Sequence, residues 1–322
     1  MEVGSGSVGQ GYDGRGCASV GHHPLALVSE SCNRRAMRQN IWVWCVMVGL
    51  GLGMTGCAEQ APRPVISGQM ESIVIGQSFT MDSAVLGEKR RITVYLPADY
   101  DKTAQRYPVL YLLDGGIKED FHHITGIVQV SVANGLMDPI LVIGIENTER
   151  RRDMTGPTEN PEDKKIAPHV GESARFRRFF KDELVPRIER DFRGNGERTL
   201  LGESLAGLFV VETFLEDPSL FQRYISVSPS LWWNDGSLLK RAPEQLKTLP
   251  LQGKTLYLTV GGKQDNTKET NQFAEALRST APAGLTWYYE LMPDEAHATA
   301  LHSGALVALR KFFAAKTLEG ER

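Results

Sequence analysis

The chain has few cysteines, four among 322 residues, and none in its larger part. All four lie within the first 57 residues: Cys17, Cys32, Cys45 and Cys57. Disulfide frameworks, thiolate zinc sites and cysteine nucleophiles are therefore excluded from the sequence that follows Cys57.

An excess of charge of one sign is also absent. The chain contains 36 Lys and Arg residues against 39 Asp and Glu residues, which gives a formal net charge of -3. A general nucleic-acid binder carries a basic excess, so we expect no nucleic-acid partner. The 16 prolines and the 32 glycines, which follow no period, exclude a collagen-like chain, and 41% hydrophobic residues suffice for a folded core.

Long hydrophobic runs are scarce as well. The uncharged apolar run over residues 41–54 has 14 residues, which is short for a bilayer span. Arg34, Arg35 and Arg38 precede it, like the positive region of a signal peptide. It ends in the sequence Met-Thr-Gly-Cys, which resembles a bacterial lipobox whose cysteine, here Cys57, receives a lipid.

The N-terminal sequence therefore predicts a signal peptide and a lipid anchor. We expect a lipoprotein signal peptide at 37–56 and a tether at 57–68, so that the mature protein is held by lipid on a bacterial membrane in the cell envelope. Ala58, in place of Asp, favours the periplasmic side of the outer membrane. Residues 1–36 are rich in Gly and Ser and are interpreted as disordered or as a wrongly assigned start. A signal anchor, or cleavage at a residue other than Cys57, is the alternative.

Residues 69–322 are predicted to form a single domain of alternating strands and helices. Continuous apolar runs suit strands that are buried on both faces, so we expect an α/β fold with a mostly parallel sheet and helices on both faces. A first strand is expected to begin at 73–75, and 147–171 is expected to be a surface loop. The other predicted strands are 91–96, 107–113, 140–145, 200–201, 224–227, 256–260 and 287–291. The predicted helices are 172–192, 204–216, 268–280 and 303–316.

One strand–turn–helix segment carries the pattern of a nucleophile elbow. In TLLGESLAG, residues 199–207, Ser204 stands two residues after Gly202 and two before Ala206. Small residues are needed there because the strained turn brings the strand and helix backbones very close. We predict that Ser204 is the nucleophile; an N-capping serine at an ordinary turn is the alternative.

A nucleophilic serine needs a base and, in the usual triad, an acid. In α/β-hydrolases the chain order is nucleophile, acid, histidine. His297 follows the last predicted strand and fits the base, whereas His302 is expected to lie in the final helix. Asp265 follows the preceding strand and is the predicted acid, with Glu269 as the alternative.

The oxyanion of acyl transfer needs two N–H donors. One is predicted to come from Leu205, the residue after the nucleophile. The other is predicted to come from Gly116, which follows an earlier apolar strand and lets the backbone approach a ligand closely.

Several segments together resemble the enterobactin-esterase type of α/β-hydrolase, a group of siderophore esterases and esterase D-like proteins. The resemblance covers about residues 70–315. It departs from the common pattern at Glu203, where His is usual, and at Ala206, where Gly is usual. Some of these esterases use a Ser–His dyad, which leaves the role of Asp265 open. The segments are YLLDGG, VIGIENTERRRDMT, FFKDELVPRIERDFR and TLLGESLAGLFVVETFLEDPSLFQRYISVSPSLWWND.

The resemblance also implies residues that contact the substrate. Arg150 and Arg152 match basic positions near the pocket mouth and could hold an anionic or catechol-bearing substrate; a solvated basic run is the alternative. Trp232 and Trp233 could form the wall of an aromatic pocket or fill the core.

We therefore expect a serine esterase that acts on a small-molecule carboxylic ester through an acyl-enzyme on Ser204, with no metal or organic cofactor. The resemblance adds siderophore esters to the candidate substrates. Two alternatives remain, an acyltransferase on the same fold and a non-catalytic ligand-binding lipoprotein at the cell envelope. No pattern in the sequence indicates an oligomeric state.

Overall fold

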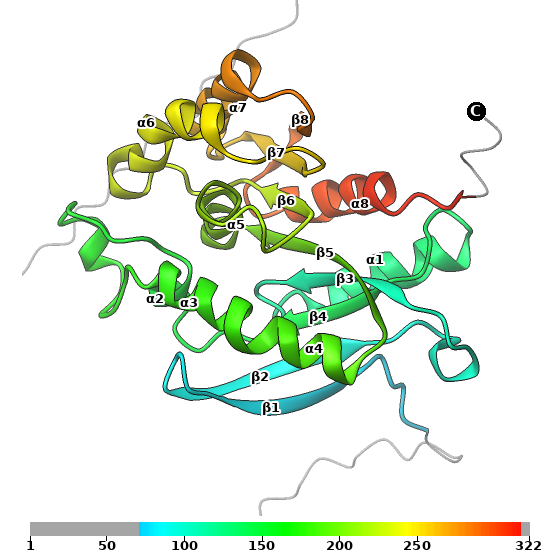
Figure 1. Cartoon of the computed structure of the whole chain (residues 1–322). Helices are drawn as coiled ribbons and strands as arrows, with labels where there is room; N and C mark the ends of the chain where they lie inside the picture. The colour runs from blue at the N-terminus through cyan, green and yellow to red at the C-terminus, as the bar shows by residue number, and fades with distance from the viewer. Residues whose placement is uncertain (1–70, 317–322) are drawn as a thin grey trace, which may run out of the picture. The chain divides into compact units, whose positions relative to one another are not determined.

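The computed structural model describes residues 71–316, so the predicted signal peptide, Cys57 and the tether lie outside the described residues. An eight-stranded sheet runs through this part in the order β1-β2-β4-β3-β5-β6-β7-β8 (Figure 1). β2 is antiparallel to both β1 and β4, and every other neighbouring pair is parallel. The strands are β1 (Gln77–Ser83), β2 (Glu88–Tyr95), β3 (Tyr107–Leu112), β4 (Leu141–Ile145), β5 (Gly194–Glu203), β6 (Arg223–Val227), β7 (Thr255–Lys263) and β8 (Thr286–Ala296).

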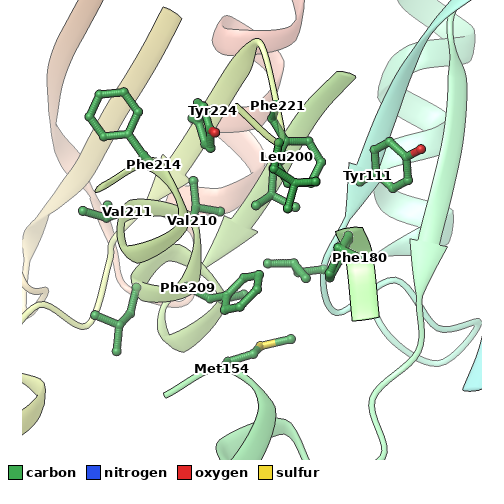
Figure 2. Packing of buried hydrophobic residues seen from close by; sticks show 14 of the residues in the cluster. Tyr111, Met154, Phe180, Leu200, Phe209, Val210, Val211, Phe214, Phe221 and Tyr224 are labelled. Atoms are coloured by element: carbon green, nitrogen blue, oxygen red, sulfur yellow. The ribbon is translucent and has the colours of Figure 1, made fainter. Parts of the chain in front are cut away.

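Helices cover both faces of the sheet (Figure 1), which confirms the predicted α/β fold. α1 and α8 pack on one face, while α3, α4, α5, α6 and α7 pack on the other. Figure 2 shows part of the core on this second face, where Phe209 of α5 lies among side chains from the sheet and from the other helices. The helices are α1 (Phe121–Ala133), α2 (Arg150–Asp153), α3 (Ser173–Phe179), α4 (Val185–Asp191), α5 (Leu205–Glu216), α6 (Trp233–Thr248), α7 (Thr267–Thr280) and α8 (Ala300–Phe312).

The helix predicted over 172–192 is interrupted by a π-helical turn at Phe180–Leu184. Pro186 follows in the first turn of α4. Proline has no N–H to donate to the carbonyl four residues earlier, and a wider turn accommodates that missing bond. The apolar face predicted for this segment is nevertheless buried, with Phe176, Phe179 and Phe180 fully inside the core.

Two predictions at the level of the fold are wrong. The first strand begins at Gln77 rather than at 73–75, because its register with β2 starts where Gln77 faces Val94. The segment 147–171 is not wholly a surface loop, since it contains α2 and buries Met154 against the core. In the part of the chain that the structure describes, no helix is long and apolar enough to cross a bilayer.

The parallel pairing brings the carboxyl ends of six neighbouring strands to one edge of the sheet. β5 lies in the middle, with β3 and β4 on one side and β6, β7 and β8 on the other (Figure 1). Every residue in the predicted site follows the end of one of these strands, and sites in open α/β sheets form at this edge.

Candidate active site

Ser204 lies in a sharp turn between β5 and α5. Its φ of 61° and ψ of -118° are strained for a residue with a side chain. Its N–H donates to Val227 O at 3.0 Å, and its carbonyl accepts from Ser230 N at 3.0 Å, so the neighbouring loop holds the turn. A Cβ on Gly202 would lie 2.7 Å from the carbonyl carbon of Ala206. The pattern of small residues thus follows from the close approach of strand and helix, as predicted.

Two further side chains complete a hydrogen-bonded series with Ser204. His297 directly follows β8, and its Nε2 lies 3.1 Å from Ser204 Oγ. Asp265 follows β7, and its Oδ1 lies 2.7 Å from His297 Nδ1. The sequence order and the strand ends therefore bring the three predicted residues together in the predicted geometry. Glu269 lies on α7 beside Lys268, at 3.9 Å, and does not contact His297, so the alternative acid is not supported.

Asp265 is held by four donors. Its Oδ2 accepts from Ser228 Oγ at 2.5 Å and from Gly261 N at 2.7 Å, while Oδ1 also accepts from Asn266 N at 2.7 Å. Burial by itself raises the pKa of this carboxyl, but hydrogen bonds from His297, Ser228 and the backbone outweigh it and hold the pKa below its ordinary value. Asp265 is therefore a fixed anion at neutral pH.

The Asp265 carboxylate makes the His297 imidazole more basic. The hydrogen bond from Asp265 raises the pKa of His297 above its ordinary value, against the opposing effect of burial, and Glu203 adds to the rise. A more basic imidazole accepts a proton from Ser204 more readily, and the hydrogen bond at Nδ1 leaves Nε2 to face the hydroxyl.

The two predicted oxyanion donors differ in the structure. Leu205 is the first residue of α5, so its N–H belongs to the amides at a helix start that have no intrahelical acceptor. Gly116 N–H, in contrast, donates to Glu119 Oε2 at 2.7 Å. Glu119 N donates to Gly116 O at 3.0 Å, which makes a reciprocal turn before α1. The prediction of Gly116 as a free donor is therefore wrong for this conformation, because a carboxylate occupies it.

Arg150 lies beside the elbow, but its charge is already matched within the protein. Its Nε and Nη2 donate to the two carboxylate oxygens of Asp114 at 2.6 and 2.8 Å, and Nη2 also reaches Glu203 O at 3.2 Å. Asn147 Nδ2 donates to Asp114 as well, at 2.6 Å. Arg150 thus braces the turn before Ser204 and is not a free cation for an anionic substrate.

The prediction that Arg152 contacts substrate is wrong. Its guanidinium is buried and pairs with Asp153, Glu88 and Glu149 at 2.7, 2.8 and 3.0 Å. These carboxylates belong to a network with the fully buried Arg90, which ties β2 to α2. Of the two arginines predicted to contact substrate, Arg150 therefore lies at the edge of the site and Arg152 belongs to the buried scaffold.

The two tryptophans also have separate roles. Trp233 is buried, and its Nε1 donates to Gly156 O at 2.8 Å, so its prediction as a substrate contact is wrong and its core alternative holds. Trp232 remains 39% exposed at the start of α6 and is still a candidate surface for substrate.

Sequence reasoning missed several polar residues at this edge. Ser230 Oγ lies 3.4 Å from Ser204 Oγ, and Ser228 holds Asp265. Both belong to the Ser-Pro-Ser sequence after β6, and the position after a strand end could have identified them. Glu119 and Asp120 open α1 close to the end of β3. In residues 71–316, no group of three or more His, Cys, Asp or Glu residues is placed to hold a metal ion.

Comparison with known proteins places the chain in a family. The Esterase family model, described as "Putative esterase", matches residues 83–302. The ferri-bacillibactin esterase BesA of Bacillus subtilis is 38% identical over 42% of this chain and 52% of its own length. The apo-salmochelin esterase of Escherichia coli is 29% identical over 52% of this chain and 55% of its own length. The chain thus spans about half the length of these relatives.

Solved structures show the same architecture. An IroE-like serine hydrolase from Shewanella oneidensis is 29% identical, with a TM-score of 0.67 over 74% of this chain and 80% of that chain. This likeness identifies the sheet and its helices as an α/β-hydrolase fold, as predicted. Since the family model spans more than half of the sequence, the chain belongs to the Esterase family of α/β-hydrolases.

Proposed function

We propose that this protein is a serine hydrolase of carboxylic esters that works through an acyl-enzyme on Ser204. The observation that carries the proposal is the series Ser204 Oγ–His297 Nε2, 3.1 Å, and His297 Nδ1–Asp265 Oδ1, 2.7 Å, at a strained strand–helix turn. A nucleophile, a base and an orienting acid in this arrangement are the parts that acyl transfer requires. The same arrangement argues against the non-catalytic binding lipoprotein.

In the proposed reaction, Ser204 Oγ attacks the ester carbonyl while His297 Nε2 takes its proton. Leu205 N–H stabilises the oxyanion of the tetrahedral intermediate. His297 then gives its proton to the leaving alcohol, and the acyl group remains on Ser204. Water, deprotonated by His297, releases the acid and restores the hydroxyl.

Siderophore esters are the substrate class that we propose. Support comes from the relatives, which are named as esterases of bacillibactin and salmochelin, one for the iron-loaded and one for the iron-free compound. Hydrolysis with water as the acyl acceptor agrees with these names better than transfer to an alcohol.

The test is a hydrolysis panel with p-nitrophenyl acetate and a triscatecholate trilactone. We expect wild-type turnover of both, and a loss of kcat of about 10⁵–10⁶-fold in Ser204→Ala and in His297→Ala. Turnover near the wild-type rate in either folded variant would contradict the proposal.

We further propose the lipid anchor at Cys57 and a place in the cell envelope. The lipobox-like sequence and the preceding arginines support this. Mass spectrometry of the mature protein tests it: a diacylglyceryl-modified Cys57 at the N-terminus is expected, and a mature N-terminus at another residue would remove the anchor.

A further inference from the structure

Ser230 carries a hydroxyl that the proposed reaction does not use. It lies in the loop after β6, is only 2% exposed, and its Oγ lies 3.4 Å from Ser204 Oγ. Within residues 71–316, Ser204 Oγ is the one hydrogen-bond partner of this hydroxyl. Buried polar groups are kept where they have a partner, so the contact with the nucleophile calls for a physical reason.

The loop that carries Ser230 is fixed against the nucleophile elbow. Ser230 N donates to Ser204 O at 3.0 Å, and Ser204 N donates to Val227 O at 3.0 Å. Gly207 in α5 permits this approach, because a Cβ there would lie 2.7 Å from Val227 O and 3.1 Å from the Cα of Pro229. The backbone therefore holds the two hydroxyl groups side by side.

The hydrogen-bond network decides which of the two hydroxyl groups is the donor. Asp265 is an anion that only accepts, so His297 Nδ1 carries the proton in the bond of 2.7 Å between them. Nε2 of the neutral imidazole then accepts, and the Ser204 proton points to it across 3.1 Å. Ser204 has no second proton, so the Ser230 hydroxyl donates and Ser204 Oγ accepts.

We infer that Ser230 is a further catalytic residue, whose hydroxyl donates to Ser204 Oγ and chiefly accelerates the release of the acyl group from it. The inference rests on the proposed esterase function and adds a role within it. In the resting enzyme Ser204 Oγ is neutral, and the contact of 3.4 Å is long. Hydrogen bonds to a charged oxygen are shorter and stronger, and catalytic contacts tighten as charge develops, so this bond gains strength when Ser204 Oγ becomes negative.

Negative charge develops on Ser204 Oγ when that oxygen is the leaving group. In deacylation, water attacks the acyl carbonyl carbon while His297 Nε2 takes a proton from the water. The bond between that carbon and Ser204 Oγ then breaks, its electron pair goes to Oγ, and His297 returns the proton to Oγ. Ser230 keeps its own proton throughout and stabilises the departing oxygen until protonation is complete.

The same hydrogen bond helps acylation less than deacylation. A donor on Ser204 Oγ eases the loss of its proton but weakens the oxygen as a nucleophile, so the two effects on acylation oppose each other. The same donor can only help the oxygen as a leaving group, as is known for thiols, where a lower pKa weakens the attacking group and speeds the departing one. Loss of the Ser230 hydroxyl should therefore slow deacylation selectively, which a merely structural role would not do.

Ser230→Ala, assayed with p-nitrophenyl acetate, tests this selectivity. p-Nitrophenolate leaves readily, so with this ester kcat reports deacylation, while kcat/KM reports acylation. We expect kcat to fall about tenfold, equivalent to about 1.4 kcal/mol, and kcat/KM to change by less than about threefold. Acid quench during turnover, followed by intact-protein mass spectrometry, should show the acetyl-enzyme as the main species of the variant.

Two further variants separate the hydroxyl from the packing around it. Ser230→Cys keeps nearly the same volume but offers only a weak donor, so it should slow deacylation in the same direction. Ser226→Ala is the matched control, because Ser226 is a buried serine on β6 whose Oγ donates to Gly207 O, at 3.0 Å, rather than to the nucleophile. It perturbs the same contact between β6 and α5, and its ratio of kcat to kcat/KM should equal that of the wild type.

The results separate this inference from the proposal on which it rests. Suppose that Ser204→Ala abolishes hydrolysis, but that the Ser230 variants keep the wild-type kcat or lose kcat and kcat/KM in parallel without accumulating acetyl-enzyme. The inference is then overturned and the esterase function stands. If Ser204→Ala retains the wild-type turnover, the esterase function and the inference fall together.

Discussion

Replacing Glu203 by Gln should stabilise the protein at alkaline pH and have little effect at acid pH. Glu203 is protonated in the folded protein up to a pKa of about 7, whereas its ordinary value is 4.5. Between these values the folded state holds a proton that the unfolded chain has lost, so the free energy of unfolding falls as the pH rises. Glutamine cannot ionise and removes this dependence.

The magnitude follows from the two pKa values. Each pKa unit corresponds to about 1.4 kcal/mol, so ionising Glu203 in the folded protein costs up to roughly 3 kcal/mol at pH 8. Part of that cost is relieved because the side chain is only partly withdrawn from water and its neighbours relax. We therefore expect Glu203→Gln to raise the free energy of unfolding by about 1–3 kcal/mol at pH 8, and by less than about 1 kcal/mol at pH 5.

Urea unfolding of the wild type and of Glu203→Gln at pH 5 and pH 8 measures this difference. Asp82→Asn is the control, because Asp82 is an exposed carboxylate on β1 that pairs with Lys89. Comparison at the same pH cancels the titration of groups that the variants share. A stabilisation by Glu203→Gln that is the same at both pH values would refute the reasoning, since it would show that Glu203 ionises normally in the folded protein. A loss of stability at pH 8 would refute it as well.

Three further changes probe the site and its scaffold. Asp265→Asn should lower kcat by about 10³–10⁴-fold and move the acid limb of the pH–rate profile to lower pH, because His297 loses the partner that raises its pKa; an unchanged profile would point to a dyad. Gly202→Ala places a Cβ 2.7 Å from the carbonyl carbon of Ala206, and should cost about 1–3 kcal/mol in thermal unfolding; an unchanged Tm would contradict the close approach. Arg152→Ala should destabilise the protein by about 1–3 kcal/mol, because Asp153 and Glu88 lose one of their two cations and keep only Arg90, whereas a change in KM alone, with normal stability, would restore its predicted role at the substrate.

Much of the fold could be predicted because the strands have a distinctive sequence pattern. Buried parallel strands are continuous apolar runs, such as 107–113 and 140–145, and they correspond to β3 and β4. The helices α1 and α6 are harder to predict from sequence patterns. α1 is rich in β-branched residues that also suit strands, and α6 begins with a turn of left-handed backbone at Asn234–Gly236 and contains Pro243.

The positions of Ser204, His297 and Asp265 could be predicted because their chemistry depends on chain order and strand ends. The pairing of charges could not, because it depends on which side chains meet across the sheet. Arg150 and Arg152 are two residues apart, yet one reaches Asp114 after β3 and the other reaches Glu88 on β2. The residues that neighbour Arg150 and Arg152 in the sequence do not indicate which carboxylates these arginines pair with.

The most direct test of the central claim is covalent labelling with a fluorophosphonate at neutral pH, followed by peptide mass spectrometry. The hydrogen-bonded series predicts a single adduct on Ser204 that disappears in Ser204→Ala and is strongly reduced in His297→Ala. An adduct on another residue, or no adduct on the folded wild-type protein, would contradict the assignment of this edge of the sheet as the active site.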